Sequence, residues 1–491
     1  MADGTRLVAD AWHPAGDGKW PVLLQRLPYG RSSASTPVLP HPAWFARRGY
    51  AVVVQDVRGC GDSEGSFEPF VDEGSDGATT IEWVAGLPFS NGDVATYGFS
   101  YQGLNQLYAA ALQPPSLRAI APMMCCPDPY EGWTYENGCL RWSFVAEWAA
   151  QLVSLEAGGK VEADLDAVPL ETALGIDPPT WFREWLEHPA DDAYWAARRP
   201  DLSRIHVPAF TVLGWFDDFA AGTARMIERL DAAAVCGPWA HMPWGTRLGD
   251  LEFGADASGR SAADALIAFL DRVLKGRGEQ PVEKVSYYSP GSGWSSTPSW
   301  PPTSDDRQLA ATSDGDANSR GGTGRLVWEH VPKGPPDVLV ADAADPHPGA
   351  APLTSEAVSE DRRDVLSYTS DPFTEPLAIA GSPSVEIEFS ADRTRHHLVA
   401  ALVAVGRDDE PRCISQGAVR VDHRSPGSRQ PIRITMSPIA WTSDTGTRLR
   451  LDITVDRFPF VARVVAGDED SGSTCQTTVE VLSATLRLPL V

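Results

Sequence analysis

The stretch Val94-Ala-Thr-Tyr-Gly98-Phe-Ser100-Tyr-Gln-Gly103, which runs on to Leu112, decides how this chain is expected to fold. A β-type run from Val94 to Gly98 leads almost directly into a helical run from Tyr101 to Leu112. Ser100 stands between the two runs, with glycines close by on both sides. A sharp strand–turn–helix needs such small neighbours, because the residue at its apex is strained and crowded. The pattern therefore favours Ser100 as an exposed nucleophile.

Strand and helix signals alternate around this turn. The continuous β-branched run Tyr50-Ala-Val-Val-Val-Gln55 is typical of a strand buried on both faces of a parallel sheet. Alternation of such strands with helices predicts a parallel sheet that is covered on both sides. Further strands are expected at residues 22–24, 94–98, 117–122, 207–214 and 233–237, and helices at 42–48, 74–85, 101–112, 224–230 and 262–274.

The chain has 491 residues, enough for about three domains. Residues 130–200 are rich in aromatic side chains and have a helical rhythm, so we expect a helical insertion there. Short alternating runs beyond residue 325 predict an all-β sandwich. We therefore predict an α/β fold of the α/β-hydrolase type, with a catalytic domain in two parts (1–123 and 206–304), an inserted helical cap (124–205) and a C-terminal jelly roll (305–491).

A second serine competes with Ser100 for the role of nucleophile. Gly61-Asp-Ser63-Glu-Gly65 is a literal G-x-S-x-G motif, whereas the glycine after Ser100 comes one residue late. Ser63, however, lies seven residues past the end of its expected strand, and no helix can begin directly after it. We predict that Ser63 belongs to a glycine-rich turn. From local sequence alone, Ser100 could also be a helix N-cap.

The predicted partners of Ser100 follow two later strands, in the chain order Ser, Asp, His that this fold uses. Asp217 closes one strand and His241 closes the next. Because the carboxyl ends of parallel strands meet at one edge of a sheet, these side chains are expected to lie close together. Asp218 is the adjacent alternative to Asp217, whereas His206 precedes its strand and belongs to the opposite edge.

Composition and charge restrict the partners of the protein. A formal net charge of −25 argues against binding to nucleic acid or to an anionic membrane, because both bind basic surfaces. The sequence has no apolar run of about 18 residues and no apolar signal segment, so we expect a cytoplasmic protein without a membrane span. A homodimer is one option for its assembly. No residue cluster has zinc spacing, and we expect neither a metal nor another cofactor.

Five motifs together resemble the cocaine esterase family of serine hydrolases, which also includes X-Pro dipeptidyl peptidases, glutaryl acylases and α-amino acid ester hydrolases. These motifs are Asp3-Gly-Thr-Arg-Leu-Val-Ala-Asp10, Gln55-Asp-Val-Arg-Gly-Cys-Gly-Asp-Ser-Glu-Gly65, Gly98-Phe-Ser-Tyr-Gln-Gly103, Gly214-Trp-Phe-Asp217 and Gly237-Pro-Trp-Ala-His241. The resemblance runs through the whole chain and implies the same catalytic domain, cap and jelly roll.

The resemblance also implies roles for individual residues. It makes Asp217 the acid, and it assigns two donors to the oxyanion: the hydroxyl of Tyr29 and the backbone N–H of Tyr101. A phenol suits this role because it offers one directional hydrogen-bond donor. Two features depart from the family. The leading strand is missing or shortened, and the carboxylate cluster with which the amino ester hydrolases would bind a substrate ammonium is mostly absent.

The expected reaction is hydrolysis of a carboxylic ester, or of an activated amide, through an acyl-enzyme. Four aromatic residues are expected to contact the substrate and, as a group, favour an apolar or aromatic acyl portion: Trp133, Trp142, Phe144 and Trp215. One alternative is an amidase, acylase or X-Pro-type dipeptidyl peptidase on the same triad. Another is a catalytically inactive binding protein, against which the complete Ser, Asp, His and Tyr set argues.

Overall fold

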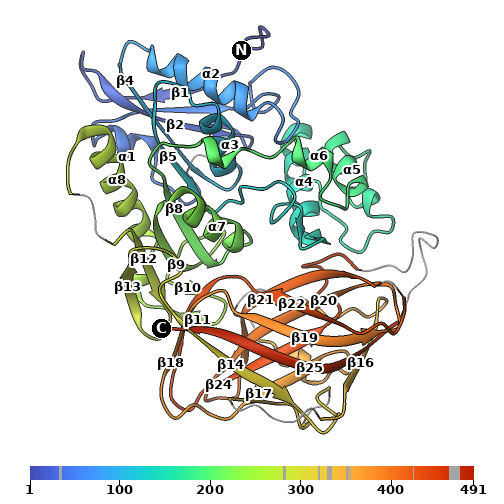
Figure 1. Ribbon diagram of the computed structural model, residues 1–491. Coiled ribbons are helices and arrows are strands. Elements are labelled where there is room, and N and C mark those ends of the chain that lie inside the picture. The colour runs from blue at the N-terminus through green and yellow to red at the C-terminus, as the bar shows by residue number, and fades with distance from the viewer. Residues whose placement is uncertain are drawn as a thin grey trace.

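The computed structural model describes residues 1–32, 36–279, 283–318, 321–328, 334–349, 353, 355–423, 425–463 and 476–491. An α/β domain and a cap come first, and an all-β domain follows (Figure 1). Within these described residues, no helix is both long and apolar enough to cross a membrane.

A mostly parallel sheet forms the centre of the α/β domain. One set of strands has the spatial order β1 (Ala9–Trp12), β3 (Ala51–Asp56), β2 (Trp20–Leu27), β4 (Ser90–Phe99) and β5 (Leu117–Met123). A parallel bridge between Ile120 and Ala209 joins β5 to the second set. That set contains β8 (Phe210–Phe216), β9 (Ala233–Ala240), β12 (Val285–Ser289) and β13 (Gly293–Thr297). Only β1 and β13, at the two edges, pair antiparallel.

Alternate residues of the strands feed two hydrophobic cores, one on each face of the sheet. Val22 and Leu24 of β2 pack with α2 (Glu73–Ala85) and α3 (Tyr101–Ala111). Leu23, between them, packs with α1 (Pro42–Ala46) and α8 (Arg260–Lys275). This period of two is that of a strand buried on both faces. The predicted parallel sheet with helices on both sides is confirmed.

The cap is inserted between β5 and β8 and is mainly helical, as predicted. It contains α4 (Trp142–Ala157), α5 (Thr180–Glu187) and α6 (Ala193–Ala196), with 3₁₀ turns at Leu170–Thr172 and Leu202–Arg204. It also contains a short antiparallel pair, β6 (Tyr135–Glu136) and β7 (Cys139–Leu140), which the sequence did not indicate. α7 (Ala220–Leu230) follows β8 where the catalytic domain resumes.

The C-terminal region is an all-β domain built around a hydrophobic core. Its longest strand, β25 (Gln476–Leu490), pairs antiparallel with four others. The other elements of this domain are β14 (Asp305–Thr312), β15 (Arg325–Val327), β16 (Asp337–Asp342), the short helix α9 (Ala357–Glu360), β17 (Leu366–Ser370), β18 (Leu377–Gly381), β19 (Ser384–Ala391), β20 (Arg395–Val405), β21 (Pro411–Asp422), β22 (Gln430–Thr435), β23 (Ile439–Ser443) and β24 (Arg448–Thr454). Two short strands of the catalytic domain, β10 (Arg247–Leu248) and β11 (Leu251–Glu252), pair with each other. The predicted fold class is confirmed.

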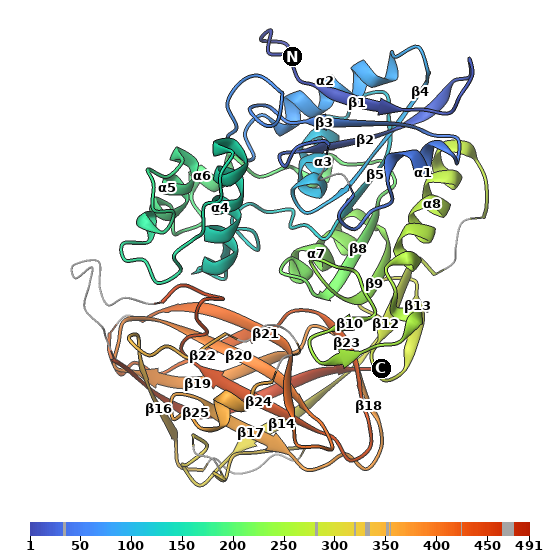
Figure 2. The same ribbon diagram turned by 180° about the vertical axis from the view of Figure 1, so that it is seen from behind.

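The β domain contacts both the cap and the catalytic domain (Figure 2). Asn137 of the cap donates from its side chain to the carbonyl of Ala418 at 2.9 Å. On the catalytic domain, the carbonyl of Pro290 accepts a hydrogen bond at 2.9 Å from the N–H of Thr442 in the β domain. The β domain therefore contacts the cap as well as the catalytic domain.

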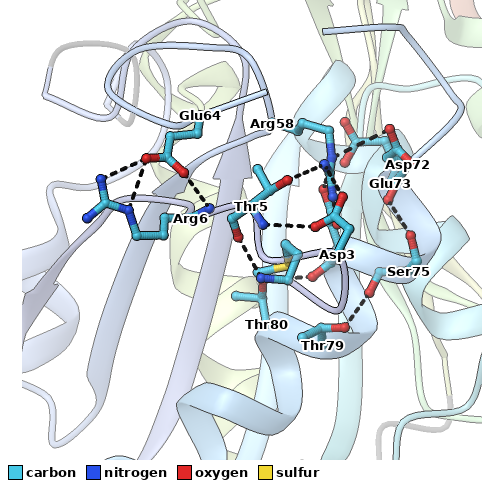
Figure 3. A network of polar contacts seen from close by, with 12 residues as sticks. Asp3, Thr5, Arg6, Arg58, Glu64, Asp72, Glu73, Ser75, Thr79 and Thr80 are labelled. Atoms are coloured by element: carbon cyan, nitrogen blue, oxygen red, sulfur yellow. Dashed lines mark hydrogen bonds and ion pairs between the residues drawn. The ribbon is translucent and has the colours of Figure 1, made fainter. Parts of the chain in front are cut away.

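The loop after β3 is fastened to the N-terminal segment (Figure 3). Arg58 in this loop donates to Asp3 at 2.7 Å and to Asp76 of α2 at 2.8 Å. Arg6 pairs with Glu64 at 2.7 Å on the exposed side, where an ion pair contributes little. The better-shielded contacts of Arg58 hold the loop between the N-terminal segment and α2.

Candidate active site

Ser100 forms the turn between β4 and α3, as the strand–turn–helix pattern predicted. Its φ of 62° and ψ of −135° are rare for a residue with a side chain and cost on the order of 1–3 kcal/mol. The Ser100 N–H donates to the carbonyl of Met123 at 2.9 Å. Its side chain makes no capping hydrogen bond to α3, so the N-cap alternative finds no support. This backbone geometry is that of a nucleophile elbow.

The two glycines near Ser100 are needed for steric reasons. A Cβ on Gly98 would lie 2.6 Å from the Cβ of Gln102, and the φ of Gly98 is 151°. A Cβ on Gly103 would lie 2.9 Å from the sulfur of Cys125. Both distances are shorter than real contacts allow. The second glycine is therefore required one residue later than in the literal motif, because α3 crosses close to Cys125 there.

Asp217 and His241 meet at the carboxyl edge of the sheet. They directly follow the neighbouring parallel strands β8 and β9, and the imidazole Nδ1 lies 2.7 Å from Asp217 Oδ1. The Asp217 side chain is fully buried, whereas that of His241 is 23% exposed. The ring of Phe99, the residue before Ser100, lies 5.3 Å from the imidazole between centroids. The structure thus brings the predicted acid and base together beside the turn that carries Ser100.

Asp218 has a different partner. Its carboxylate lies 3.3 Å from the guanidinium of the buried Arg141, and its carbonyl accepts a hydrogen bond from the same side chain at 2.8 Å. About half of the Asp218 side chain is exposed. This arrangement favours Asp217, not Asp218, as the partner of His241.

The surroundings of His241 determine when its ring is charged. Burial by itself lowers the pKa of the imidazole, but the charge of Asp217 and the hydrogen bond to it outweigh burial. The pKa of His241 is therefore raised above the ordinary histidine value. An imidazole that gains a proton easily is suited to stabilising the imidazolium that forms when a serine is deprotonated.

Tyr29 follows β2, and its hydroxyl oxygen accepts a hydrogen bond from the indole N–H of Trp148 at 2.9 Å. Burial raises the pKa of Tyr29 to about 12, while hydrogen bonds with Trp148 and Ser100 act in the opposite direction. Tyr101 is the first residue of α3, so its backbone N–H has no acceptor within the helix. Both predicted oxyanion donors therefore lie next to Ser100.

Buried polar contacts hold these donors in place. The hydroxyl of Tyr101 donates to Glu73 at 3.0 Å, and Glu73 pairs with Arg26 at 2.8 Å. The segment that carries Tyr29 is held by Arg31, whose backbone N–H donates to Asp56 at 2.6 Å. Sequence reasoning did not single out these contacts. The one available signal was Asp56, a carboxylate at the end of the buried strand β3.

Ser63 is engaged in the turn in which it lies. Its hydroxyl donates to the carbonyl of Asp56 at 2.8 Å and accepts from the N–H of Val8 at 2.9 Å. Gly61 is needed in this turn because a Cβ there would lie 2.3 Å from the Asp56 carboxylate. The literal G-x-S-x-G motif is thus part of a structural turn, as predicted.

Two of the four predicted substrate contacts lie near His241. Trp133 stacks on Phe219 at 4.8 Å, and Phe144 meets Phe219 edge-on at 5.1 Å. Phe219 in turn lies 5.5 Å from the imidazole of His241. Trp133 and Phe144 therefore belong to an aromatic wall on the cap side of the site.

The contacts of the other two do not support a substrate role. Trp142 is fully buried and donates its N–H to the carbonyl of Leu165 within the cap. Trp215 donates to the carbonyl of Tyr288 and packs with the core of the β domain. Trp142 thus packs inside the cap and Trp215 packs toward the β domain, roles that the spacing of aromatic residues in the sequence could not distinguish from substrate binding.

Two cavities border these residues. A cavity of about 760 Å³ extends from Tyr29 between the loop after β3 and the cap helices. A smaller one, of about 320 Å³, lies where cap, catalytic domain and β domain meet, and Asp217 and Asp218 border it. Within the described part of the chain, no cluster of three metal-ligating side chains occurs. The larger cavity is the size of a small-molecule site.

Both the α/β part and the β domain of the chain match known protein families. Residues 3–243 match the X-Pro dipeptidyl-peptidase (S15) family, and residues 278–484 match the X-Pro dipeptidyl-peptidase C-terminal non-catalytic domain. A cocaine esterase from Rhodococcus sp. (strain MB1 Bresler) is 30% identical over 471 residues, which cover 86% of this chain and 82% of that protein. The chain belongs to the cocaine esterase and X-Pro dipeptidyl-peptidase family of serine hydrolases. The family resemblance inferred from the motifs is confirmed.

Solved structures support the same fold for this family member. An aminopeptidase from a marine sediment Thaumarchaeota archaeon superposes with a TM-score of 0.85 at 22% identity, covering 100% of this chain and 95% of the other. An α-amino acid ester hydrolase gives a TM-score of 0.84, with the same identity and coverage. At this level of identity, the two structures show that catalytic domain, cap and β domain are arranged alike.

Replacing the two neighbouring aspartates separates their roles. Asp217→Asn should lower kcat by about 10⁴-fold, because the amide cannot hold His241 in the required tautomer or stabilise its charge. Asp218→Asn should lower kcat far less, since only the contact of the Asp218 carboxylate with Arg141 is lost. Steady-state kinetics on both variants tests this, and the reverse ranking would show that Asp218 is the acid.

The pH dependence follows from the charge on His241. The base must be neutral, so kcat/KM should rise with pH through the His241 pKa, with a midpoint above about 6.5. In the residual activity of Asp217→Asn the midpoint should move to lower pH, because the charge that most strongly opposes the effect of burial on the His241 pKa is then removed. A kcat/KM profile of each enzyme measures both values, and a midpoint that does not respond to Asp217→Asn would contradict the assignment.

Proposed function

We propose that the protein is a serine esterase that cleaves a small carboxylic ester by an acyl-enzyme mechanism. The observation that carries this proposal is the buried Asp217–His241 pair at 2.7 Å, located at the sheet edge where the strained turn presents Ser100. Such a pair activates a serine hydroxyl for attack on a carbonyl carbon.

The proposed reaction has two steps. His241 takes the proton of Ser100 as the serine oxygen attacks the ester carbonyl, and Tyr29 with the Tyr101 N–H binds the oxyanion of the tetrahedral intermediate. The intermediate collapses to the acyl-enzyme, and the alcohol leaves with the proton returned by His241. Water, deprotonated by His241, then attacks the acyl-enzyme and releases the carboxylic acid and free Ser100.

The aromatic wall favours an apolar or aromatic acyl group. Trp133 and Phe144 meet at Phe219, which lies against His241, so an acyl group held beside the imidazole would contact rings. On the cap side, the larger cavity is lined by the apolar residues Leu152, Val153, Leu155, Ile176 and Trp181 and by the carboxylates of Glu156, Asp177 and Glu184. Burial of a phenyl ring against the apolar residues stabilises the complex through the hydrophobic effect.

Amide hydrolysis on the same triad is the second candidate. The match to the X-Pro dipeptidyl-peptidase family favours it, since a triad that cleaves esters also serves peptide bonds. A p-nitrophenyl ester and a p-nitroanilide of the same aromatic acid distinguish the two. An ester to anilide ratio of kcat/KM that exceeds the ratio of their spontaneous hydrolysis rates supports the esterase, and a lower ratio supports the amidase.

Labelling by a fluorophosphonate probe tests the nucleophile. Ser100→Ala should abolish both labelling and ester hydrolysis, because no other oxygen is activated by His241. Ser63→Ala is the matched control and should still be labelled, since the Ser63 hydroxyl only bonds Asp56 and Val8. A probe adduct found on Ser63, or an unlabelled wild-type protein, would overturn the proposal.

Tyr29→Phe tests the oxyanion donor. Losing one of two such donors should lower kcat by about 10²–10³-fold, roughly 2.7–4 kcal/mol, whereas KM should change little. The ring and its packing remain, so the melting temperature should fall only by the effect of one lost hydrogen bond, the one from Trp148. A Tyr29→Phe enzyme with wild-type turnover would remove Tyr29 from the proposed site.

A further inference from the structure

Trp148 of α4 is a cap residue in direct contact with Tyr29. Its indole Nε1–H donates to the Tyr29 oxygen at 2.9 Å, although the two residues are 119 positions apart in the chain. A tyrosine hydroxyl carries a single hydrogen. Because the oxygen already accepts from Trp148, its own hydrogen has to point in another direction. Ser100 is a second hydrogen-bonding neighbour of this hydroxyl.

The ring of Trp148 is fixed on several sides. It stacks on Trp185 at 5.7 Å with 2° between the planes, and on Tyr101 at 5.8 Å with 23°. Trp133 meets it edge-on at 5.4 Å, and only 6% of Trp148 is exposed. With its ring held in this way, the N–H has one direction available, and that direction leads to Tyr29.

The indole N–H groups of two neighbouring tryptophans differ from that of Trp148 in their hydrogen bonding. The N–H groups of Trp133 and Trp185 are buried and have no hydrogen-bond partner among the residues that the structure describes. In the same aromatic stack, Trp148 therefore combines packing with a directed hydrogen bond. Since packing alone does not require that bond, it points to a role at the site.

We propose that Trp148 is a positioning residue of the oxyanion site. Its N–H directs the hydrogen of Tyr29 toward the carbonyl oxygen of a substrate under attack by Ser100. The inference rests on the proposed function and extends it to the cap. A hydroxyl that accepts one hydrogen bond donates a stronger one, since the two bonds polarise each other. Because the oxyanion develops in the transition state, the stronger hydrogen bond should raise kcat and leave KM nearly unchanged.

Trp148→Phe removes the N–H and retains a stacked ring. It should lower kcat by roughly 2- to 12-fold, the loss expected for a single net hydrogen bond, with KM nearly unchanged. Trp185→Phe is the matched control. It makes the same ring contraction in the same stack, but the N–H that it removes has no partner in the described structure, so any loss of kcat should be smaller than that of Trp148→Phe.

A double-mutant cycle with Tyr29→Phe decides whether Trp148 acts through the Tyr29 hydroxyl. In the Tyr29→Phe background, Trp148→Phe should cause no further loss of kcat, because no hydroxyl is left to orient. An equal loss in both backgrounds, or an equal loss in Trp185→Phe, would overturn the inference and make Trp148 a packing residue. Wild-type kcat in Trp148→Phe would also overturn it.

Two further measurements keep these outcomes interpretable. If Trp148→Phe folds poorly, as a low melting temperature would show, 3-benzothienylalanine at position 148 replaces the N–H by sulfur in a ring of the same shape, and the same loss of kcat is expected. Fluorophosphonate labelling of Ser100 is followed in every variant. If Ser100 is labelled in every variant but Trp148→Phe leaves kcat unchanged, this inference alone is overturned. If the wild-type protein is not labelled, the proposed function itself is overturned.

Discussion

The site depends on one backbone constraint, which is that β4 turns into α3 within a single residue. Ser100 can occupy this turn only with a positive φ, and the strain is borne by buried contacts on both sides. Its N–H bonds to Met123 at the end of β5, and glycines at 98 and 103 let the chain pass Gln102 and Cys125. The position of the hydroxyl thus depends on the parallel pairing of β4 with β5, and through β5 on the rest of the sheet.

Much of this arrangement could be predicted from the sequence, because its causes are local. An uninterrupted apolar run such as residues 50–54 indicates a strand buried on both faces. A residue that directly follows a parallel strand lies at the carboxyl edge of the sheet. For that reason Asp217 and His241 could be paired although 24 positions separate them. Context also decided between the two serines: Ser63 matches the literal motif but does not lie between a strand and a helix.

What could not be predicted depends on contacts between distant segments. Nothing near Trp148 in the sequence distinguishes it from Trp142, yet one indole donates to Tyr29 and the other to Leu165 inside the cap. Trp215 was expected at the substrate as one of four aromatic residues. However, successive residues of a strand point to opposite faces, and its ring packs toward the β domain. The direction of a side chain follows from packing, which spacing alone does not reveal.

The aromatic stack of the cap ties substrate selection to the chemistry of the oxyanion. Trp133, in the wall beside His241, packs edge-on against Trp148, and Trp148 bonds Tyr29 and stacks on Tyr101. Interiors are close-packed, so a change in the volume of Trp133 displaces Trp148 as well. On the proposed mechanism, the residues that would define the acyl pocket then cannot vary independently of the oxyanion donors. The β domain adds a third constraint, because it contacts the cap through the hydrogen bond from Asn137 to Ala418.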